Sequence, residues 1–372
     1  MRVVIAPDKF KGSLDAAGVA AALAAGVRDA IPGAACDLVP MADGGDGTVA
    51  AFLASGANAH RLRVSGPLGA PVDATYARDG DVAIVEMAAA SGLVLAGDRA
   101  DSRRASTRGT GELLRDALAG GAKRIVLGIG GSATTDGGAG ALAALGARFL
   151  DASGAELEPM PAALARVARV DLAALDPRLH AVDIAIACDV NNPLLGPQGA
   201  AAVYGPQKGA SSDDVAFLDG VLARLADAMT AATGRDLRAL PGAGAAGGLG
   251  WALASACGAR LERGVALIAE IRGLAHALEG ADWCFTGEGR IDEQTLRGKV
   301  VDGVAALARA ANVRVIAFGG SVDLAVEQTL RARGVRCVPV VPGPMTLEEA
   351  MRDAEANLRA AAARVAAFLS GG

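Results

Sequence analysis

Four of the five lysines in this chain lie in short segments that are rich in glycine: Lys9, Lys11, Lys208 and Lys299. A lysine ammonium is a compact point charge that suits phosphate oxygens. Glycine allows backbone N–H groups to come close to an anion, and a helix N-terminus that follows favours negative charge. This combination predicts loops that bind phosphate, although Lys208 and Lys299, taken singly, are equally compatible with solvated surface positions.

Carboxylates gather in the same segments. They are Asp8, Asp43, Asp46, Asp136, Asp189, Glu288 and Asp292. Mg²⁺ is commonly held by one or two carboxylates together with substrate phosphates. Transfer of a phosphoryl group needs that metal, cations on the phosphates and often an Asp that accepts the hydroxyl proton. Lysines, glycines and carboxylates together therefore predict phosphate transfer from a nucleotide.

Six segments share this design, and most come directly after an expected strand. They are residues 7–13, 42–48, 128–140, 188–210, 241–250 and 286–299. Ligands of open α/β sheets bind at the carboxyl ends of the strands. One glycine loop is usually a tight turn, whereas six loops with charges and hydroxyls indicate a site.

Other nucleotide-binding motifs are missing or weak. The sequence has no G-x-x-x-x-G-K-[ST] and no protein-kinase H-R-D or D-F-G. A G-x-G-x-x-G occurs at Gly242–Gly247, but Pro241 precedes it and residues 235–240 make a poor strand. A nicotinamide-dependent hydroxy-acid oxidoreductase stays open on this pattern, yet close packing of the glycines against a neighbouring segment is the favoured interpretation.

Composition narrows the class of protein. Of 372 residues, 52% are hydrophobic, 3% are aromatic and 50 are glycine, with a net charge of −5. We expect a folded chain with a core of Ala, Val and Leu, and neither a nucleic-acid binder nor a membrane-surface protein. Five scattered cysteines and three isolated histidines predict neither a disulfide framework nor a zinc site, and no secretory leader is expected, so the cytoplasm is the predicted location.

The elements that position these loops alternate between strands and helices at both ends of the chain. Strands are expected at 2–6, 36–40, 283–286, 313–318 and 335–341, and helices at 14–30, 300–311, after 321 and from 346. Such alternation predicts a mostly parallel sheet covered on both faces. Ser13 could cap the first helix or contact a phosphate. The uncharged stretch 239–259 is interpreted as a glycine-rich loop followed by a buried helix.

The middle of the chain differs, because expected strands at 60–65, 72–78 and 82–87 follow closely on one another. Such runs suggest antiparallel or mixed pairing. Further strands are expected at 123–129, 149–150 and 184–188. We therefore predict two α/β domains: a parallel-sheet domain from residues 1–65 and 280–372, and an inserted domain with a mixed sheet from residues 66–279.

At this point the motifs resemble a known family. APDKFKGSL, ADGGDGT, GGSATTDGGAGALAALG, CDVNNPLLGPQGAAAVYGPQKGA, PGAGAAGGLG and TGEGRIDEQT followed by GK, in this order, are similar to the bacterial type 1 glycerate kinases. The resemblance runs from Met1 to the C-terminal helix. It implies phosphorylation of D-glycerate by ATP with Mg²⁺, and a flavodoxin-like domain with a second domain inserted in it and the active site in the cleft between them. Asp46 departs from the Glu that such enzymes often have, but it keeps a carboxylate.

Roles are then assigned to individual residues. Asp189 ends a strand and is the candidate general base, with a turn-stabilising Asp as the alternative. The catalytic set also includes Lys9 and Lys11, which face anionic groups. The remaining candidates are Asp8, Asn191 and Arg290 for the substrate; Gly130, Gly131, Ser132, Thr134, Thr135, Lys208 and Lys299 for ATP; and Asp43, Glu288 and Asp292 for the metal.

Other functions stay open beside this interpretation. They are a kinase of another small hydroxy acid, the oxidoreductase, and a protein that only binds a small anion. The 2-hydroxyl of glycerate is the expected site of phosphorylation because bacterial members of the family lean that way, and the 3-hydroxyl stays open. A homodimer is possible, but the sequence does not determine the oligomeric state.

Overall fold

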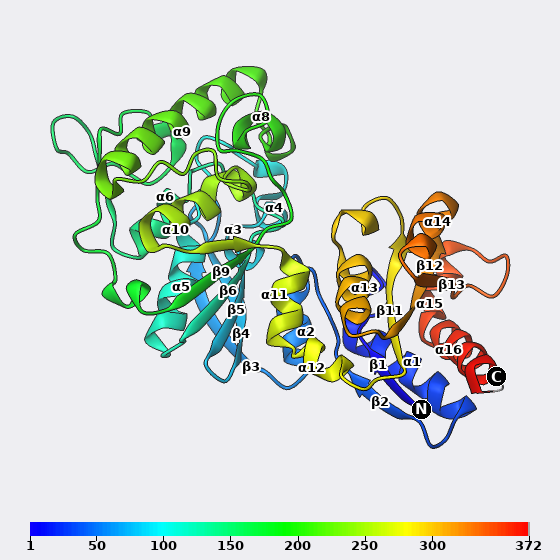
Figure 1. Cartoon of the computed structure of the whole chain (residues 1–372). Coiled ribbons are helices and arrows are strands. Elements are labelled where there is room, and N and C mark those ends of the chain that lie inside the picture. The colour runs from blue at the N-terminus through cyan, green and yellow to red at the C-terminus, as the bar shows by residue number, and fades with distance from the viewer. Residues whose placement is uncertain (371–372) are drawn as a thin grey trace. The chain divides into compact units, whose positions relative to one another are not determined.

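The computed structural model describes residues 1–370, and its contacts divide the chain into two compact units. The first unit joins the two ends of the chain, Met1–Asp43 and the segment from Arg263 onward, and the second unit is Gly44–Glu262. In Figure 1, the red and orange C-terminal segments belong to the same unit as the blue N-terminal strands, while the cyan and green segments form the other.

The division falls at 43/44 and 262/263, whereas the sequence suggested boundaries near 65 and 280. Strand β3 (Asn58–Ser65) pairs with β4 (Pro71–Asp79) along its whole length, so this stretch belongs to the sheet of the second unit. At the other end, helix α11 (Gly264–Ile271) packs against α13 (Val300–Ala310) of the first unit. Tertiary pairing therefore decides where each linker segment belongs.

Five strands, all paired in parallel, form the sheet of the first unit. In spatial order they are β13 (Val335–Pro339), β12 (Arg314–Val322), β11 (Trp283–Ile291), β1 (Arg2–Ile5) and β2 (Ala35–Leu38). Numbered within this unit, the order is 2-1-3-4-5, which is the flavodoxin-like order. The predicted parallel-sheet domain from both chain ends is thus present.

Helices cover both faces of this sheet. Alternate side chains such as Val3 and Ile5 join a core cluster with α1 (Ala16–Ala30) and α16 (Ala354–Ser370). The two helices approach closely, because a Cβ on Gly26 would lie 2.1 Å from the Arg359 carbonyl oxygen. On the opposite face, α13 contacts β11 and β12, and α14 (Leu324–Ala332) contacts β13. Two short helices complete the unit, α12 (Leu274–Leu278) and α15 (Leu347–Arg352).

A six-stranded mixed sheet forms the frame of the second unit. In spatial order its strands are β10 (Arg260–Glu262), β9 (Asp183–Ala187), β6 (Arg124–Gly128), β5 (Val82–Glu86), β4 and β3. Neighbours from β10 to β5 are parallel, while β5, β4 and β3 are antiparallel, as the closely spaced strands predicted. The short strands β7 (Arg148–Leu150) and β8 (Arg169–Asp171) pair separately.

Alanine, valine and leucine dominate the core of the second unit, which also encloses Trp251 and Phe149. The α-helices of this unit are α2 (Thr48–Ala54), α3 (Ala88–Ser91), α4 (Leu93–Ala96), α5 (Arg108–Ala119), α6 (Ala139–Ala144), α7 (Pro161–Leu164), α8 (Ala200–Tyr204), α9 (Ser212–Thr233) and α10 (Leu249–Cys257). The uncharged stretch 239–259 forms a loop and the buried helix α10. Among residues 1–370, no helix combines the length and apolar character needed to span a membrane.

Helix α1 shows how one sequence expectation changes. Asp15, and not Ser13, caps it, because the Asp15 carboxylate accepts a hydrogen bond of 2.7 Å from the Gly18 N–H. The Ser13 hydroxyl instead donates to the Phe10 carbonyl oxygen at 3.0 Å and closes a turn. Of the two roles considered for Ser13, the cap is therefore wrong. At the other end of the chain, Thr346 caps α15 through a reciprocal pair of hydrogen bonds with Glu349.

Candidate active site

Asp8 lies at the carboxyl end of β1, where the chain passes beside β11. Its N–H donates to the Gly287 carbonyl oxygen at 2.8 Å, and its carboxylate accepts a hydrogen bond of 2.7 Å from the Lys9 N–H. The side chain is almost fully buried. Burial, followed by the negative charge of Asp43, raises the pKa of Asp8 to about 7. Asp8 is therefore a carboxyl group that titrates near neutral pH.

Glu288 was expected in a loop but lies on β11, which continues to Ile291 and keeps its register with β12. Its carboxylate is buried and accepts a hydrogen bond from the Thr295 hydroxyl. Burial raises the pKa of Glu288 to about 7; the Thr295 hydrogen bond and the charge of Lys299 oppose the rise. The charges of Asp292 and Asp43 add to it. Two buried carboxyl groups, of Asp8 and Glu288, and two half-buried ones, of Asp43 and Asp292, thus form an acidic cluster beside the ammonium groups of Lys9 and Lys299.

This cluster lies at the point where the strand order of the first unit reverses. Strand β11 lies between β1 and β12, and β1 separates β11 from β2. Open α/β sheets bind their ligands in the crevice outside the carboxyl ends of the strands at such a switch point. Asp8 after β1 and Glu288 near the end of β11 occupy that position. The strand order alone, without any sequence motif, therefore indicates that the acidic cluster lies where such sheets bind ligands.

The predicted metal set is only partly brought together. The negative charges of Asp43 and Asp292 both raise the pKa of Glu288, so the three carboxylates lie near one another. Asp292 also accepts a hydrogen bond of 2.9 Å from the Gln294 N–H and lies 3.4 Å from the Arg290 guanidinium. Among the described residues, no group of three acidic, histidine or cysteine side chains has the geometry of a ready metal site.

The cations of the first unit vary in exposure. Lys11 and Arg290 are exposed, while Lys9 and Lys299 are partly buried. Lys299 occupies the position before α13, and its charge lowers the pKa of Glu288. Lys9 and Lys11 follow Asp8 directly. These groups provide positive charge at the same edge of the sheet as the acidic cluster.

The loop after β6 contains the predicted anion-binding residues of the second unit. The Leu93 N–H donates to the Gly131 carbonyl at 2.8 Å, and the Ala133 N–H donates to the Ser91 carbonyl at 3.0 Å. Gly131 needs its positive φ of 69°, and a Cβ on Gly130 would meet only the Cα of Gly45, at 3.5 Å. The backbone at Gly130 is therefore open to close approach by a ligand.

Lys208 is buried against this loop, only 2% exposed, and is not a solvated surface lysine. Its Nζ donates to the Thr134 carbonyl oxygen at 2.5 Å and to the Ser132 hydroxyl at 3.4 Å. Burial lowers the pKa of Lys208 to about 8, and the charge of Asp136 opposes this shift. The structure thus brings Lys208 of the 188–210 motif into contact with Ser132 and Thr134 of the 128–140 motif. Nearby in sequence, the buried Thr135 hydroxyl has no hydrogen-bond partner within the described part of the chain.

Asp136 organises the segment that follows, a role that the sequence interpretation did not assign. Its carboxylate accepts hydrogen bonds from the N–H and hydroxyl of Thr107 and from the N–H groups of Gly138 and Gly140. These donors lie at the start of α5 and of α6. Burial raises the pKa of Asp136, and the four hydrogen bonds oppose that rise. In the sequence, the only sign of this structural role was the aspartate at the end of the ATTD motif.

The G-x-G-x-x-G pattern is a packing feature. A Cβ on Gly244 would lie 2.2 Å from the Pro193 carbonyl oxygen, and one on Gly247 would lie 2.1 Å from the Thr134 carbonyl oxygen. The residues before it form no strand, so the strand–turn–helix context of a dinucleotide site is absent from this described segment. The preference for close backbone packing is confirmed, and it links these glycines to the Thr134 loop.

Asp189 and Asn191 lie in an exposed loop after β9. Because β9 pairs in parallel with β6, this loop leaves the same edge of the sheet as the Gly130–Thr135 loop. The adjacent Asn192 joins the loop to α8, since its side chain accepts a hydrogen bond of 2.7 Å from the Tyr204 hydroxyl. The general-base role of Asp189 stays a prediction.

Comparisons with known proteins agree along the whole chain. The family model described as the glycerate kinase family matches residues 3–370. The chain belongs to the glycerate kinase family. It is 44% identical to "Glycerate kinase" of Bacillus subtilis (strain 168) over 99% of this chain and 98% of that protein. It is 43% identical to "Glycerate 2-kinase" of Escherichia coli (strain K12) over 100% of this chain and 98% of that protein.

A solved structure extends the likeness to three dimensions. A crystal structure of a protein from Salmonella typhimurium LT2, provisionally named glycerate kinase 2, matches with a TM-score of 0.92 and 44% identity. It covers 100% of this chain and 99% of that chain. As a member of the glycerate kinase family, the chain is an enzyme of the kinase class, as its motifs predicted.

Proposed function

We propose that this enzyme transfers the terminal phosphoryl group of ATP to the 2-hydroxyl of D-glycerate with Mg²⁺ present. The observation that supports the proposal most directly is Lys208, a buried ammonium held against the glycine loop after β6. Burying a charge without a carboxylate in contact is costly, and such groups concentrate at functional sites. An incoming phosphate would supply the missing negative charge. Family membership supports the kinase chemistry.

The ATP phosphates are assigned to the second unit. Gly130 and Gly131 offer open backbone, and the unpartnered Thr135 hydroxyl offers a further donor. Ser132 and Thr134 hold Lys208 in place through their oxygens. Lys299 of the first unit belongs to the same predicted set. These residues would bind the phosphates and neutralise charge that develops during transfer.

Glycerate and the metal are assigned to the first unit, together with Asn191. Asp8, Lys9, Lys11 and Arg290 would orient the hydroxy acid, with the cations facing its carboxylate and the transferred phosphate. One or two of Asp43, Glu288 and Asp292 would hold a Mg²⁺ ion, with phosphates and water as its other ligands, because one or two carboxylates suffice for such sites. When bound there, the ion supplies positive charge against the phosphate oxygens. That both units act in one reaction, with the active site in the cleft between them as the resemblance implies, is part of this proposal.

The hydroxyl proton requires an acceptor. Asp189 is the assigned base, and its exposed position after β9 leaves it accessible to substrate. Asp8 is a second candidate, since a carboxylate whose pKa is about 7 is well matched to proton transfer at neutral pH. Rate-against-pH profiles of Asp189→Asn and Asp8→Asn distinguish the two: the base variant loses the acidic limb of the profile and most of kcat.

The proposal is tested by ADP release in a coupled assay with D-glycerate, ATP and Mg²⁺, followed by phosphorus NMR of the product. We expect turnover that depends on glycerate and a product phosphorylated at the 2-position, the position named for the Escherichia coli relative. A 3-phosphorylated product would refute the regiochemistry only. Turnover with another small hydroxy acid alone would keep the chemistry and change the substrate. Binding without any ADP release would leave an anion-binding protein. A cytoplasmic location stays a prediction, and the oligomeric state stays open.

A further inference from the structure

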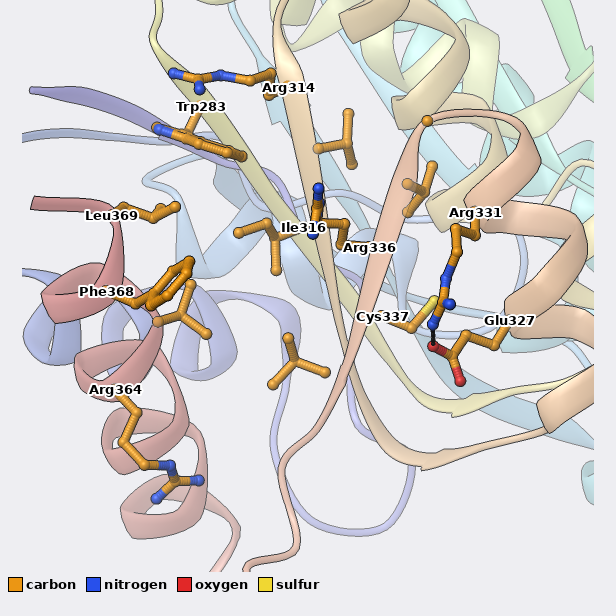
Figure 2. A pocket seen from close by; sticks show the side chains of 15 residues that line it. Trp283, Arg314, Ile316, Glu327, Arg331, Arg336, Cys337, Arg364, Phe368 and Leu369 are labelled. Atoms are coloured by element: carbon orange, nitrogen blue, oxygen red, sulfur yellow. Dashed lines mark hydrogen bonds and ion pairs between the residues drawn. The ribbon is translucent and has the colours of Figure 1, made fainter. Parts of the chain in front are cut away.

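A groove of about 1160 Å³ opens in the first unit between the beginnings of β11, β12 and β13 and the end of α16 (Figure 2). Trp283, Arg314 and Val335, the first residues of the three strands, line it. From there the lining continues along the edge strand β13 to Val338, while Asp8 and Glu288 lie at the carboxyl ends of β1 and β11. None of the carboxylates of the candidate active site, Asp8, Asp43, Glu288 and Asp292, lines the groove.

Apolar side chains form the floor of the groove. Ile316 and Val338 contribute from the sheet, and Val365, Phe368 and Leu369 contribute from the last turns of α16. Phe368 is 83% exposed, which is unusual for a large aromatic side chain in a chain with only 3% aromatic residues. In Figure 2, Phe368 and Leu369 lie on the helix side of the opening, opposite the strands. This surface offers apolar contact area that the fold itself leaves uncovered.

Arginines surround this floor. Arg331 pairs with Glu327 at 2.5 Å, so its charge is compensated. Arg314 stacks on the Trp283 ring at 3.9 Å from its centroid, and no carboxylate of residues 1–370 pairs with it. Arg336 and Arg364 are exposed and, within residues 1–370, have no hydrogen-bond or ion-pair partner. Three uncompensated guanidinium groups thus line one groove of a protein whose net charge is −5.

We propose that this groove binds an organic anion with an apolar body. A ring or acyl chain would lie on Phe368 and Val338, and a carboxylate, sulfonate or phosphate would face Arg336, with Arg364 adding positive charge from α16 on the other side of the groove (Figure 2). Charge complementarity selects this occupant, because guanidinium groups bind such oxyanions through paired hydrogen bonds. The volume suits a ligand of drug or cofactor size. Glycerate has no apolar body, so the groove is no second substrate site.

The same charges argue against a second copy of this chain as the occupant. A two-fold contact places the same patch on both partners, so arginines would face arginines across an apolar seam. Like charges that lose water without counter-ions are strongly unfavourable. An acidic protein segment with aromatic residues would satisfy the charge, but the groove is bounded on both sides by the sheet and α16. A small molecule fits this boundary better than a continuous chain does.

The test uses the full-length enzyme and the probe 8-anilinonaphthalene-1-sulfonate, an aromatic anion whose fluorescence rises on apolar surfaces. We expect one probe to bind per chain. In a Trp251→Phe background, it should also quench Trp283, which lines the groove. The double variant Arg336→Gln/Arg364→Gln should weaken binding about tenfold. The variant Phe368→Ser should weaken it as well. The matched control is Arg224→Gln, an exposed arginine on α9 of the second unit, which should bind like the parent.

Three further measurements make the proposal refutable. The uncharged analogue N-phenyl-1-naphthylamine should bind the parent and the double variant equally, and kcat with glycerate should change by less than about twofold in all variants. Unchanged sulfonate affinity in the double variant, or competition between the sulfonate and ATP or glycerate, would overturn the proposal. Displacement of the sulfonate by a peptide of alternating Glu and Phe residues, at a peptide concentration below that of the sulfonate, would also overturn the proposal. A change of molar mass on Phe368→Ser, measured by light scattering, would assign the groove to a second copy.

Discussion

Lys208 and Asp8 are ionisable side chains that the fold buries although the charged form of each prefers water. Among the residues that the structure describes, the Lys208 ammonium donates only to the neutral oxygens of Thr134 and Ser132. The Asp8 carboxylate lies near the charge of Asp43, which disfavours its ionisation further. Neither arrangement stabilises the folded state by itself. The free-energy cost of burying these two charged groups is explained if a bound ligand supplies the opposite charges.

Substitution of Lys208 by Met separates stability from function. The Met side chain has a similar volume and no charge to desolvate, so the loss of one hydrogen bond to Thr134 should be largely offset. We expect the melting temperature to stay the same or rise, while kcat/KM for ATP falls at least about a hundredfold. Lys123→Met is the control, because Lys123 is an exposed lysine paired with Asp81. Normal turnover in a destabilised Lys208→Met enzyme would make the lysine purely structural.

The stability of the first unit should depend on pH through Asp8. Its pKa is raised from 3.8 to about 7 in the folded state, so the folded state binds more protons than the unfolded state between those values. The unfolding free energy therefore falls as pH rises from about 4 to about 7, by as much as about 4 kcal/mol for this group. Glu288, whose pKa is also raised to about 7, acts with the same sign.

The variant Asp8→Asn should accordingly reduce the loss of stability between pH 5 and pH 8 by roughly 1–3 kcal/mol. Urea unfolding followed by Trp283 fluorescence, in a Trp251→Phe background, measures this because Trp283 lies in the first unit. Glu355→Gln, which removes an exposed carboxylate from α16, should leave the pH dependence as it is. An unaltered slope in Asp8→Asn would mean that the Asp8 pKa is ordinary.

The residue types of the candidate site could be predicted from the sequence, but their burial and their hydrogen-bond partners could not. The lysines and carboxylates of the glycine loops were found from residue type and spacing. That Lys208 is buried, and that Asp136 is saturated with hydrogen-bond donors, depends on segments far away in the chain. Thr107, which gives Asp136 two of its four hydrogen bonds, lies 29 positions earlier. Local pattern holds no information about such partners.

Among the elements, the turn at 245–248 and the Gly130–Thr135 loop depend on each other. Gly247 has a φ of +67°, and its Cα faces the Thr134 carbonyl oxygen, which also accepts the hydrogen bond from Lys208. A methyl group there would push this carbonyl away from the ammonium. Position 247 thus requires glycine for two reasons: its positive φ and the lack of room for a side chain.

Gly247→Ala and Gly234→Ala test this dependence as a pair. Both glycines have a φ near +70°, but a Cβ on Gly234 meets nothing within 4 Å. Gly234→Ala should cost only the conformational strain, about 1 kcal/mol of unfolding free energy. Gly247→Ala should cost at least about 3 kcal/mol and also raise KM for ATP. Thermal unfolding and steady-state kinetics of the two variants provide the comparison; equal effects would show that the contact is unimportant.

The second half of strand β11 could not be predicted from the sequence. The sequence TGEGRID is rich in glycine and charge, and it was expected to form a loop after a short strand. In the structure it continues to pair with β12, whose Phe318 carbonyl lies 2.4 Å from a Cβ built on Gly287. Strand formation there comes from pairing with a neighbour rather than from local propensity. The apolar strands at both chain ends, by contrast, were predictable from their own residues.

Each unit of the whole molecule has a core of its own. The large apolar cluster of the second unit draws only on residues between Val64 and Ala259. The cluster of the first unit joins residues 3–34 to residues 283–366. The two-part composition of the first unit was predictable from the return of strand–helix alternation near the C-terminus. The boundaries were not, because β3 and α11 are assigned by their pairing partners.

A fragment of residues 44–262 should therefore fold without the rest of the chain. We expect cooperative thermal unfolding and the blue-shifted emission of a buried Trp251, because this fragment contains the whole of its sheet and core. Residues 1–43 should stay unfolded when expressed by themselves, since β1 would lack β11. Circular dichroism and fluorescence of the two fragments test this. A non-cooperative, solvent-exposed 44–262 fragment would contradict it.

The packing of α1 against α16 also has a consequence for synthesis of the chain. The ribosome makes α1 long before α16, and the contacts of Gly26 and the Asp29–Arg359 ion pair form only when both helices are present. Until then the face of α1 that packs on α16 has no cover, and until β11 emerges one edge of β1 has no pairing partner, while the second unit can already fold as it emerges. The newborn N-terminal segment is thus the part of this enzyme most exposed to chaperones and proteases.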